Sequence, residues 1–287
     1  MEGRIGGHEI LDSRQFSLAV KRLADSLSYG TDRSPFLGSG LEYVQSRPYQ
    51  YGDPIKSIDW RVTARTRRVH VKEYEAPKRM PVYLLVDTSA SMTISSHHRS
   101  KYETAVFLAG GLALAALDRI SPVGVLGVGG RSLHVRPSLS KDQVLQWLHA
   151  LRTFRYDEPT SLAARVVELT PSLPQRVLLI VLSDLHDPDA LPALKRLRQR
   201  HDCAVLQLRD PAEERLNGVG FVRAREAETG RGFVARGRGD WLDQAHVEGQ
   251  LRRAGIDHLL IETDRPFVAD VRQFFKARNL LGRGARS

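Results

Sequence analysis

The chain of 287 residues contains a single cysteine, Cys203. One cysteine excludes an intrachain disulfide bond and any metal cluster that depends on several cysteine ligands. Cys203 begins the mostly apolar run Cys-Ala-Val-Leu-Gln-Leu, so we expect a thiol buried in the core.

Long apolar runs are also missing. The longest nearly apolar stretch extends from Thr104 to Leu117, about 14 residues, whereas a membrane-spanning helix needs about 20. Charged residues close the stretch on both sides, which favours a helix buried against a sheet, and Gly110-Gly111 would let a neighbour approach closely. The first residues lack the apolar region of a signal peptide. We therefore expect a cytoplasmic protein.

Several motifs of enzymes and nucleotide-binding proteins are absent. No Ser/His/Asp triad order is evident, and no internal repeat is visible. The glycine-rich run from Gly124 to Gly130 lacks the Gly-Lys-Ser/Thr ending of a phosphate-binding loop. The pair His97-His98 lies in a polar stretch, where solvated side chains are expected more often than metal ligands.

Acidic residues are absent from residue 60 to residue 72, although the chain as a whole carries 43 Lys+Arg and 33 Asp+Glu, a formal charge of +10. Such a balance suits acidic partners or nucleic acid. We interpret the segment as a solvated basic face, with a nucleic-acid patch as the alternative because aromatic residues lie nearby. The cations of this face are Arg61, Arg65, Arg67, Arg68 and Lys72, and the aromatic residues are Tyr49, Tyr51, Trp60 and Tyr74.

From residue 81 onward, apolar strands alternate with amphipathic helices. This order predicts an α/β fold with a mainly parallel, doubly wound sheet. The expected strands cover residues 82–87, 122–128, 132–136, 176–184, 203–208 and 257–262, and a hairpin is expected within 219–236. The expected helices cover residues 100–118, 141–151, 161–170, 188–200, 240–254 and 266–279.

The residues before this alternation differ in character. Apolar spacing predicts a helix over residues 14–29, a loop over 30–40, and short strands and turns over 41–75. We therefore expect an N-terminal helix and β-rich appendage over residues 1–80, an α/β domain over 81–280 and a basic tail over 281–287. Asp53, Asp59 and Trp60 are expected to be structural, with a buried Trp60 locking the appendage onto the α/β domain.

Polar residues follow the two most apolar strands at the point where each strand ends. Asp87-Thr-Ser89-Ala-Ser91 follows the strand at 82–87, and Asp184 ends the strand at 176–184. Thr160 stands just before a predicted helix between them. Because ligands bind at the carboxyl ends of parallel strands, the five side chains are expected at one edge of the sheet. Carboxylate and hydroxyl oxygens suit Mg²⁺ or Mn²⁺ better than Zn²⁺.

This pattern resembles the metal-ion-dependent adhesion site of von Willebrand factor type A domains. The chain also resembles, over roughly residues 13–280, the bacterial family called domain of unknown function 58. That second resemblance rests on Arg47-Pro-Tyr-Gln-Tyr-Gly-Asp53, on Ile58-Asp59-Trp60, on Ala64-Arg-Thr and on Val71-Lys-Glu. One departure is Lys56, where the family often has arginine.

The resemblance implies roles for the residues. Ser89, Ser91 and, in the ligand-bound form, Thr160 would bind the metal directly, while Asp87 and Asp184 would mostly hold its water molecules. An aspartate or glutamate from a partner would complete the octahedron. We therefore expect a non-enzymatic, Mg²⁺-dependent protein-interaction module. The resemblance suggests a MoxR-type AAA+ ATPase as partner, in a chaperone-like or assembly role.

Two other functions remain open at this stage. A Mg²⁺-dependent phosphoryl-transfer enzyme would also use an aspartate and hydroxyls at a sheet edge. However, Asp87-Thr-Ser-Ala-Ser has no second acid at the alternate position that such chemistry needs. The other alternative is a nucleic-acid-binding protein that uses the basic face, although we consider nucleic acid a less favoured partner than protein.

Overall fold

The computed structural model describes residues 2–4, 20–25, 42–75, 80–155, 157–173, 176–215, 221–225, 232–236 and 243–280. The loop predicted at 30–40, the basic tail at 281–287 and all but residues 20–25 of the predicted N-terminal helix lie outside these ranges.

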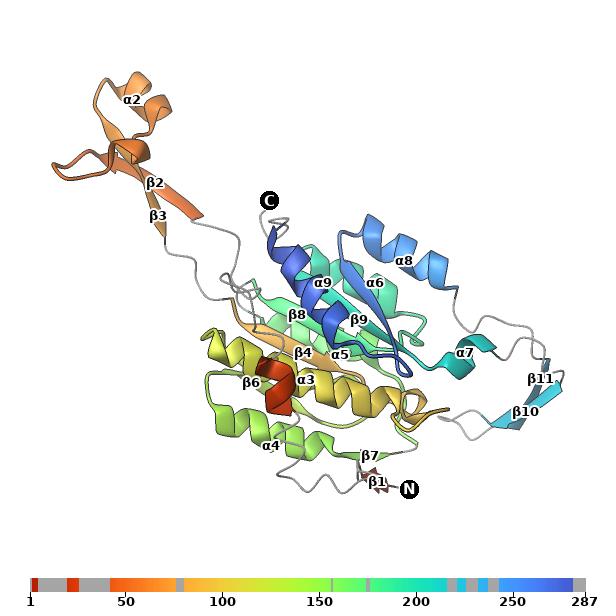
Figure 1. Ribbon diagram of the computed structural model, residues 1–287. Coiled ribbons are helices and arrows are strands. Elements are labelled where there is room, and N and C mark those ends of the chain that lie inside the picture. Colours follow the sequence, from red (N-terminus) through yellow and green to blue (C-terminus); the bar gives the residue numbers. More distant parts are fainter. Residues whose placement is uncertain are drawn as a thin grey trace.

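A six-stranded sheet forms the centre of the molecule, in the order β12–β9–β8–β4–β5–β6 (Figure 1). All neighbouring pairs are parallel except β5–β6, which is antiparallel. The mixed α/β architecture with a mainly parallel sheet is therefore confirmed. The strands are β4 (Val82–Val86), β5 (Val123–Gly127), β6 (His134–Ser138), β8 (Leu178–Ser183), β9 (Asp202–Arg209) and β12 (Asp257–Glu262).

Helices cover both faces of this sheet. One face carries α3 (Lys101–Asp118), α4 (Lys141–Leu151), α9 (Val268–Leu280) and the helical segment 20–25. The other carries α5 (Leu162–Leu169), α6 (Ala190–Arg198) and α8 (Gln244–Arg253). The central strand shows why both faces must be apolar: Val82, Leu84 and Val86 of β4 enter the first core, whereas Tyr83 and Leu85 enter the second.

Helix α3 is the long apolar helix that the sequence predicts, and it starts at a reciprocal cap. Ser100 Oγ accepts from the Glu103 backbone N–H at 3.0 Å, and the Glu103 carboxylate accepts from the Ser100 N–H at 3.1 Å. The close approach expected at its glycines is present. A Cβ added to Gly110 would lie 2.7 Å from Val20 Cγ1, so the segment 20–25 packs directly on α3 and contributes to the same core.

The appendage contains a helix that the sequence reading missed. Strands β2 (Glu42–Pro48) and β3 (His70–Glu75) pair antiparallel, and between them lie the short 3-10 helix η1 (Ile55–Ser57) and helix α2 (Trp60–Thr66). The Asp59 carboxylate starts α2 by accepting from the N–H groups of Arg61 and Val62 at 3.1 and 3.2 Å. The helix ends at Arg67, whose φ of 57° is left-handed.

Two of the three structural residues expected in the appendage have such roles. Asp53 forms a two-pronged ion pair with Arg47, both contacts at 2.8 Å, and Asp59 accepts a further bond from Ser46 Oγ at 2.7 Å. The expectation for Trp60 is wrong, because its side chain is 68% exposed. The unit formed by β2, β3 and α2 stands away from the sheet and is too small to enclose an indole ring (Figure 1).

Smaller elements complete the described chain. Strands β10 (Phe221–Arg225) and β11 (Gly232–Arg236) form the predicted hairpin. Strand β1 (Glu2–Arg4) pairs with β7 (Thr153–Arg155), and α7 (Pro211–Arg215) follows β9; neither feature was predicted. Cys203 is fully buried, as its apolar neighbours predict. None of the helices in the described ranges is long and apolar enough to cross a membrane.

Candidate metal centre

The two aspartates predicted to share a site lie at the carboxyl ends of adjacent parallel strands. Val86 of β4 is level with Leu182 of β8, so Asp87 and Asp184 leave the sheet at the same edge. The Asp87 N–H donates to the Leu182 carbonyl at 2.9 Å, and both aspartates are 1% exposed. Hence the strand register alone places two buried carboxylates beside each other.

Hydrogen bonds hold the Asp87 side chain in the loop that follows β4, residues 87–91 (the first loop). Asp87 Oδ1 accepts from the Ser89 N–H at 3.0 Å, and Asp87 Oδ2 accepts from Ser183 Oγ at 2.5 Å. The hydroxyl oxygens of Ser89 and Ser91 are 3.1 Å apart, and Ser91 also hydrogen-bonds to Asp184. Four of the five predicted residues are therefore joined by direct contacts or by electrostatic coupling of the two aspartates.

The fifth predicted residue, Thr160, lies half-buried in the loop that precedes α5. Hydrogen bonds on either side of it attach this loop to the other two loops. The Ala90 N–H donates to the Glu158 carbonyl at 2.8 Å, and the Ala163 N–H donates to Asp187 Oδ2 at 2.9 Å. Asp187 thus caps α5 from the neighbouring loop. The loop that carries Thr160 is therefore attached to the loops of the two aspartates, and the role of Thr160 as a metal ligand stays a prediction.

The turn after β8 has an unusual backbone. Leu185 has a φ of 61°, in the left-handed region that non-glycine residues rarely adopt, and its side chain is buried. Its N–H donates to Ser183 Oγ at 2.9 Å. Such strain persists where surrounding contacts hold it, often next to functional residues. Here it turns the chain so that Asp184 lies inside the site and His186 lies at the rim.

The two buried aspartates have opposite pKa shifts. Burial, and then the negative charge of Asp184, raise the pKa of Asp87 to about 7. Burial alone would raise the pKa of Asp184 too, but the charges of Lys101 and His186 and hydrogen bonds from Lys101 and Ser91 together outweigh it and lower that pKa to about 2. Asp184 is therefore the ionised member of the pair, and among the described residues no ion pair to Asp87 is formed.

The cation beside Asp184 was not recognised in the sequence. Lys101, the first residue of α3, is 0% exposed, and its Nζ donates to Asp184 Oδ2 at 2.8 Å. The same ammonium pairs with Glu213 of α7. Burial lowers the pKa of Lys101, but the two carboxylates reverse that effect and the net shift is upward. A lysine at the start of an apolar helix gives no local signal of this role, since both partners come from distant segments.

Glu213 and His186 extend the set of possible ligands. One ligand atom each from Asp184, His186 and Glu213 lie within 4.8 Å of one another, although exposed acidic groups often gather without a metal. His186 Nδ1 is 3.4 Å from Asp184 Oδ2. Lys101 already contacts two of these three groups, Asp184 and Glu213. We therefore interpret the three as an ion-paired cluster at the edge of the predicted site, rather than as a separate metal site.

A second buried network, also missed, fixes the loop that carries Thr160. Glu158, whose side chain is 2% exposed, accepts from Arg131 Nη2 at 2.8 Å and from the Arg131 backbone N–H at 3.0 Å. It also accepts from the Thr88 hydroxyl in the first loop. Arg131 Nη1 donates to the Thr153 carbonyl at 2.6 Å. The sequence did offer one signal of this network, Glu158, two residues before Thr160. A glutamate that becomes buried needs a cationic partner, here Arg131.

The donor set fits a small, hard divalent cation. It consists of carboxylate and hydroxyl oxygens around a buried pair of aspartates, and it contains no thiolate. Burial and Asp184 raise the pKa of Asp87, so a divalent ion would favour the ionised form of this carboxylate. The oxygens that could hold Mg²⁺ or Mn²⁺ here are those of Asp87, Ser89, Ser91 and Asp184, and Thr160 stays a predicted fifth member of the set.

Comparison with known proteins gives a family but no described activity. Residues 45–240, more than half of the chain, match the family described as "Protein of unknown function DUF58". An uncharacterized protein of Mycobacterium bovis and one of Mycobacterium tuberculosis are each 27% identical over 281 residues, covering 92% of this chain and 88% of theirs. An uncharacterized protein of Mycobacterium avium is 29% identical over 156 residues, covering 44% of this chain and 91% of its own. No solved structure matches the chain significantly. The chain therefore belongs to the DUF58 family of proteins of unknown function.

Proposed function

We propose that the chain is a Mg²⁺-dependent protein-interaction module, with Mn²⁺ as the alternative ion. Its α/β domain would be a von Willebrand factor A-like domain, and its metal centre a metal-ion-dependent adhesion site. The observation that carries the proposal is the buried pair Asp87 and Asp184, adjoined by the hydroxyls of Ser89 and Ser91 at the carboxyl edge of the sheet.

The charges around this pair favour a metal that binds weakly until a partner arrives. Lys101 already neutralises Asp184, so a divalent ion would meet few free negative charges. A partner aspartate or glutamate would add one in a partly desolvated setting, where charge-assisted contacts are stronger than in water. The net charge of +10 would also speed encounter with an acidic protein.

The contacts of Asp87 argue against the phosphoryl-transfer alternative. A nucleophilic carboxylate needs a free oxygen that faces the substrate. Both oxygens of Asp87 accept hydrogen bonds, and the residue is 1% exposed. We therefore propose a non-enzymatic role. The cytoplasmic location that we propose rests on the sequence instead. The partner we propose, on the family resemblance of the sequence, is a MoxR-type AAA+ ATPase in a chaperone-like or assembly function.

Metal binding is tested by titration calorimetry with MgCl₂ and MnCl₂. The wild type should bind one ion, and Asp87→Ala should bind none. Asp142→Ala, which removes an exposed carboxylate of α4, is the matched control and should bind as the wild type does. Equal binding by wild type and Asp87→Ala would overturn the metal site.

Partner binding is tested by a pull-down with a purified MoxR-type ATPase. The complex should form with Mg²⁺, disappear with EDTA, and be lost in Ser89→Ala and Thr160→Ala variants whose circular dichroism is unchanged. A complex that survives both EDTA and the Ser89 substitution would show that the metal does not bridge the two proteins.

A further inference from the structure

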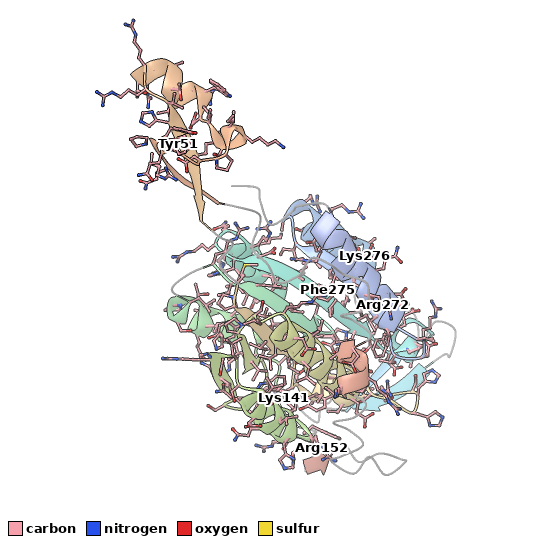
Figure 2. The ribbon with its side chains drawn as sticks, turned by 60° about the vertical axis from the view of Figure 1, so that its left-hand side comes forward. Tyr51, Lys141, Arg152, Arg272, Phe275 and Lys276 are labelled. Carbon is pink, nitrogen blue, oxygen red and sulfur yellow. The ribbon has the colours of Figure 1, made fainter. Side chains whose placement is uncertain are left out.

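The appendage exposes an unusual share of apolar side chains. Half of the large hydrophobic residues that are exposed in the described chain lie between residues 49 and 69. These are Tyr49, Tyr51, Ile55, Trp60 and Val69. Tyr51 is fully exposed and lies on the projecting unit, remote from the sheet (Figure 2). Apolar surface gathered on one small unit usually marks a binding site.

Residues 56–72 of the same unit carry exposed positive charge. Six cations between residues 56 and 72 are exposed, and none of them pairs with an acid among the described residues. Asp53, just before this segment, pairs with Arg47, and Asp59 within it accepts from the first N–H groups of α2. The six cations are Lys56, Arg61, Arg65, Arg67, Arg68 and Lys72.

Aromatic and basic side chains meet at a surface hollow of about 520 Å³. Its apolar lining includes Trp60, with Ile58 and Val62 beside it, and its cationic lining consists of Arg61, Arg65 and Lys72. Asp59 also lines the hollow, but its carboxylate accepts from Ser46 and from two backbone N–H groups. The hollow therefore combines an exposed indole ring with three cations.

We propose that this hollow binds single-stranded nucleic acid, with a base stacked on Trp60 and phosphates held by Arg61, Arg65 and Lys72. Proteins that bind single strands combine aromatic platforms with cations that follow the backbone. The three exposed cations of the hollow, against one buried carboxylate, favour this partner over a protein, because nucleic-acid interfaces are much more positive than protein–protein interfaces. The proposal is independent of the metal centre, which lies at the edge of the sheet.

The test is fluorescence anisotropy with the full chain and labelled oligo(dT) and oligo(rU) of about 20 nucleotides, a length that spans more than one typical binding site. Trp60→Ala should weaken binding roughly 5- to 100-fold, the range expected for one stacked base. The pair Arg61→Ala and Arg65→Ala should weaken it and lower the slope of log K against log salt by about 1–2. Removing two exposed cations of another face, Arg196→Ala with Arg200→Ala, should change both quantities much less.

Three results would overturn the proposal. One is the absence of measurable binding at about 0.1 M salt; another is binding that Trp60→Ala leaves unchanged. The third is that a poly-glutamate peptide competes for the site as well as unlabelled oligo(dT) does. That result would assign the hollow to an acidic protein, a partner that the exposed aliphatic Ile55 and Val69 of the same unit would also suit. Thermal melts check the variants: because Trp60 is exposed, its removal should leave the midpoint unchanged. A lowered midpoint would count against a purely surface role for Trp60.

Discussion

Lys101 is the residue whose substitution tests the charge balance of the metal centre most directly. Lys101→Met keeps most of the length of the side chain and removes its charge, which leaves Asp184 and Glu213 without their shared cation. Removing one partner of a buried ion pair typically costs about 3–5 kcal/mol. Glu213 is 18% exposed and is partly screened by water, so we expect a loss near about 3 kcal/mol. For a domain of this size that corresponds to a fall in Tm of about 6–12 °C.

A divalent ion should reverse part of this loss. The metal supplies the positive charge that the variant lacks, so Lys101→Met should bind Mg²⁺ more tightly than the wild type does. At a concentration of about 100 times Kd, a ligand that binds only the folded state stabilises it by about 2.7 kcal/mol. In Mg²⁺ the Tm of the variant should therefore rise by most of the amount that the substitution lowered it. The Tm of the wild type should rise less.

The assay is a set of thermal melts with increasing MgCl₂ and with EDTA, supported by titration calorimetry. Lys141→Met is the matched control, because Lys141 begins α4 as Lys101 begins α3 but is exposed (Figure 2). The double variant Lys101→Met with Glu213→Gln also removes one of the two carboxylates that have lost their cation. It should therefore melt at a higher temperature than Lys101→Met alone. The reasoning fails if Lys101→Met melts as the wild type does in EDTA, or if both proteins gain the same Tm from Mg²⁺.

Three further predictions concern other parts of the fold. Burial raises the pKa of the Cys203 thiol to about 12, so at pH 8 the thiol stays protonated and should react with a disulfide reagent only after unfolding; rapid reaction of the native protein would refute this. Asp59→Ala should speed hydrogen exchange at the N–H groups of Arg61 and Val62, because it removes their acceptor, and unchanged protection would show that α2 does not depend on this cap. Gly124→Ala should lower the unfolding free energy by about 1–3 kcal/mol in denaturant melts, since its Cβ would lie 2.7 Å from the Val135 carbonyl oxygen, and an unchanged midpoint would contradict that contact.

The sheet and its helices were predictable because their signals are local. A short apolar run such as β8, with six residues and flanking turn signals, favours a buried strand over a buried helix. Helix α4 begins and ends where its spacing predicts, at Lys141 and Leu151. The placement of Asp87 and Asp184 followed from the same logic, since adjacent parallel strands bring both to one edge of the sheet.

The ion pairs around the site were not predictable, because they join segments that are far apart in the chain. Lys101 is 83 residues from Asp184 and 112 residues from Glu213. No spacing rule relates such positions; only the packing of α3 and α7 at the sheet edge brings them together. The network of Arg131 and Glu158 has the same origin, over a separation of 27 residues.

Trp60 shows a different limit. A tryptophan between Asp59 and a basic run favours burial on composition alone, but burial requires enough surrounding structure to enclose the ring. The unit that carries Trp60 offers two short strands and a helix of seven residues. The indole therefore remains 68% exposed, and its surroundings, rather than its residue type, decide its role.

The buried lysine also bears on how metal and partner would act together. Since Lys101 neutralises Asp184 and contacts Glu213, the chain alone offers a divalent ion little net negative charge. A partner carboxylate would supply what is missing, so the partner would raise the affinity for the metal. By thermodynamic linkage, the metal must then raise the affinity for the partner by the same factor. Lys101 would thus make the proposed module dependent on both ligands, because the metal alone meets too little negative charge and the partner carboxylate alone meets no free divalent cation.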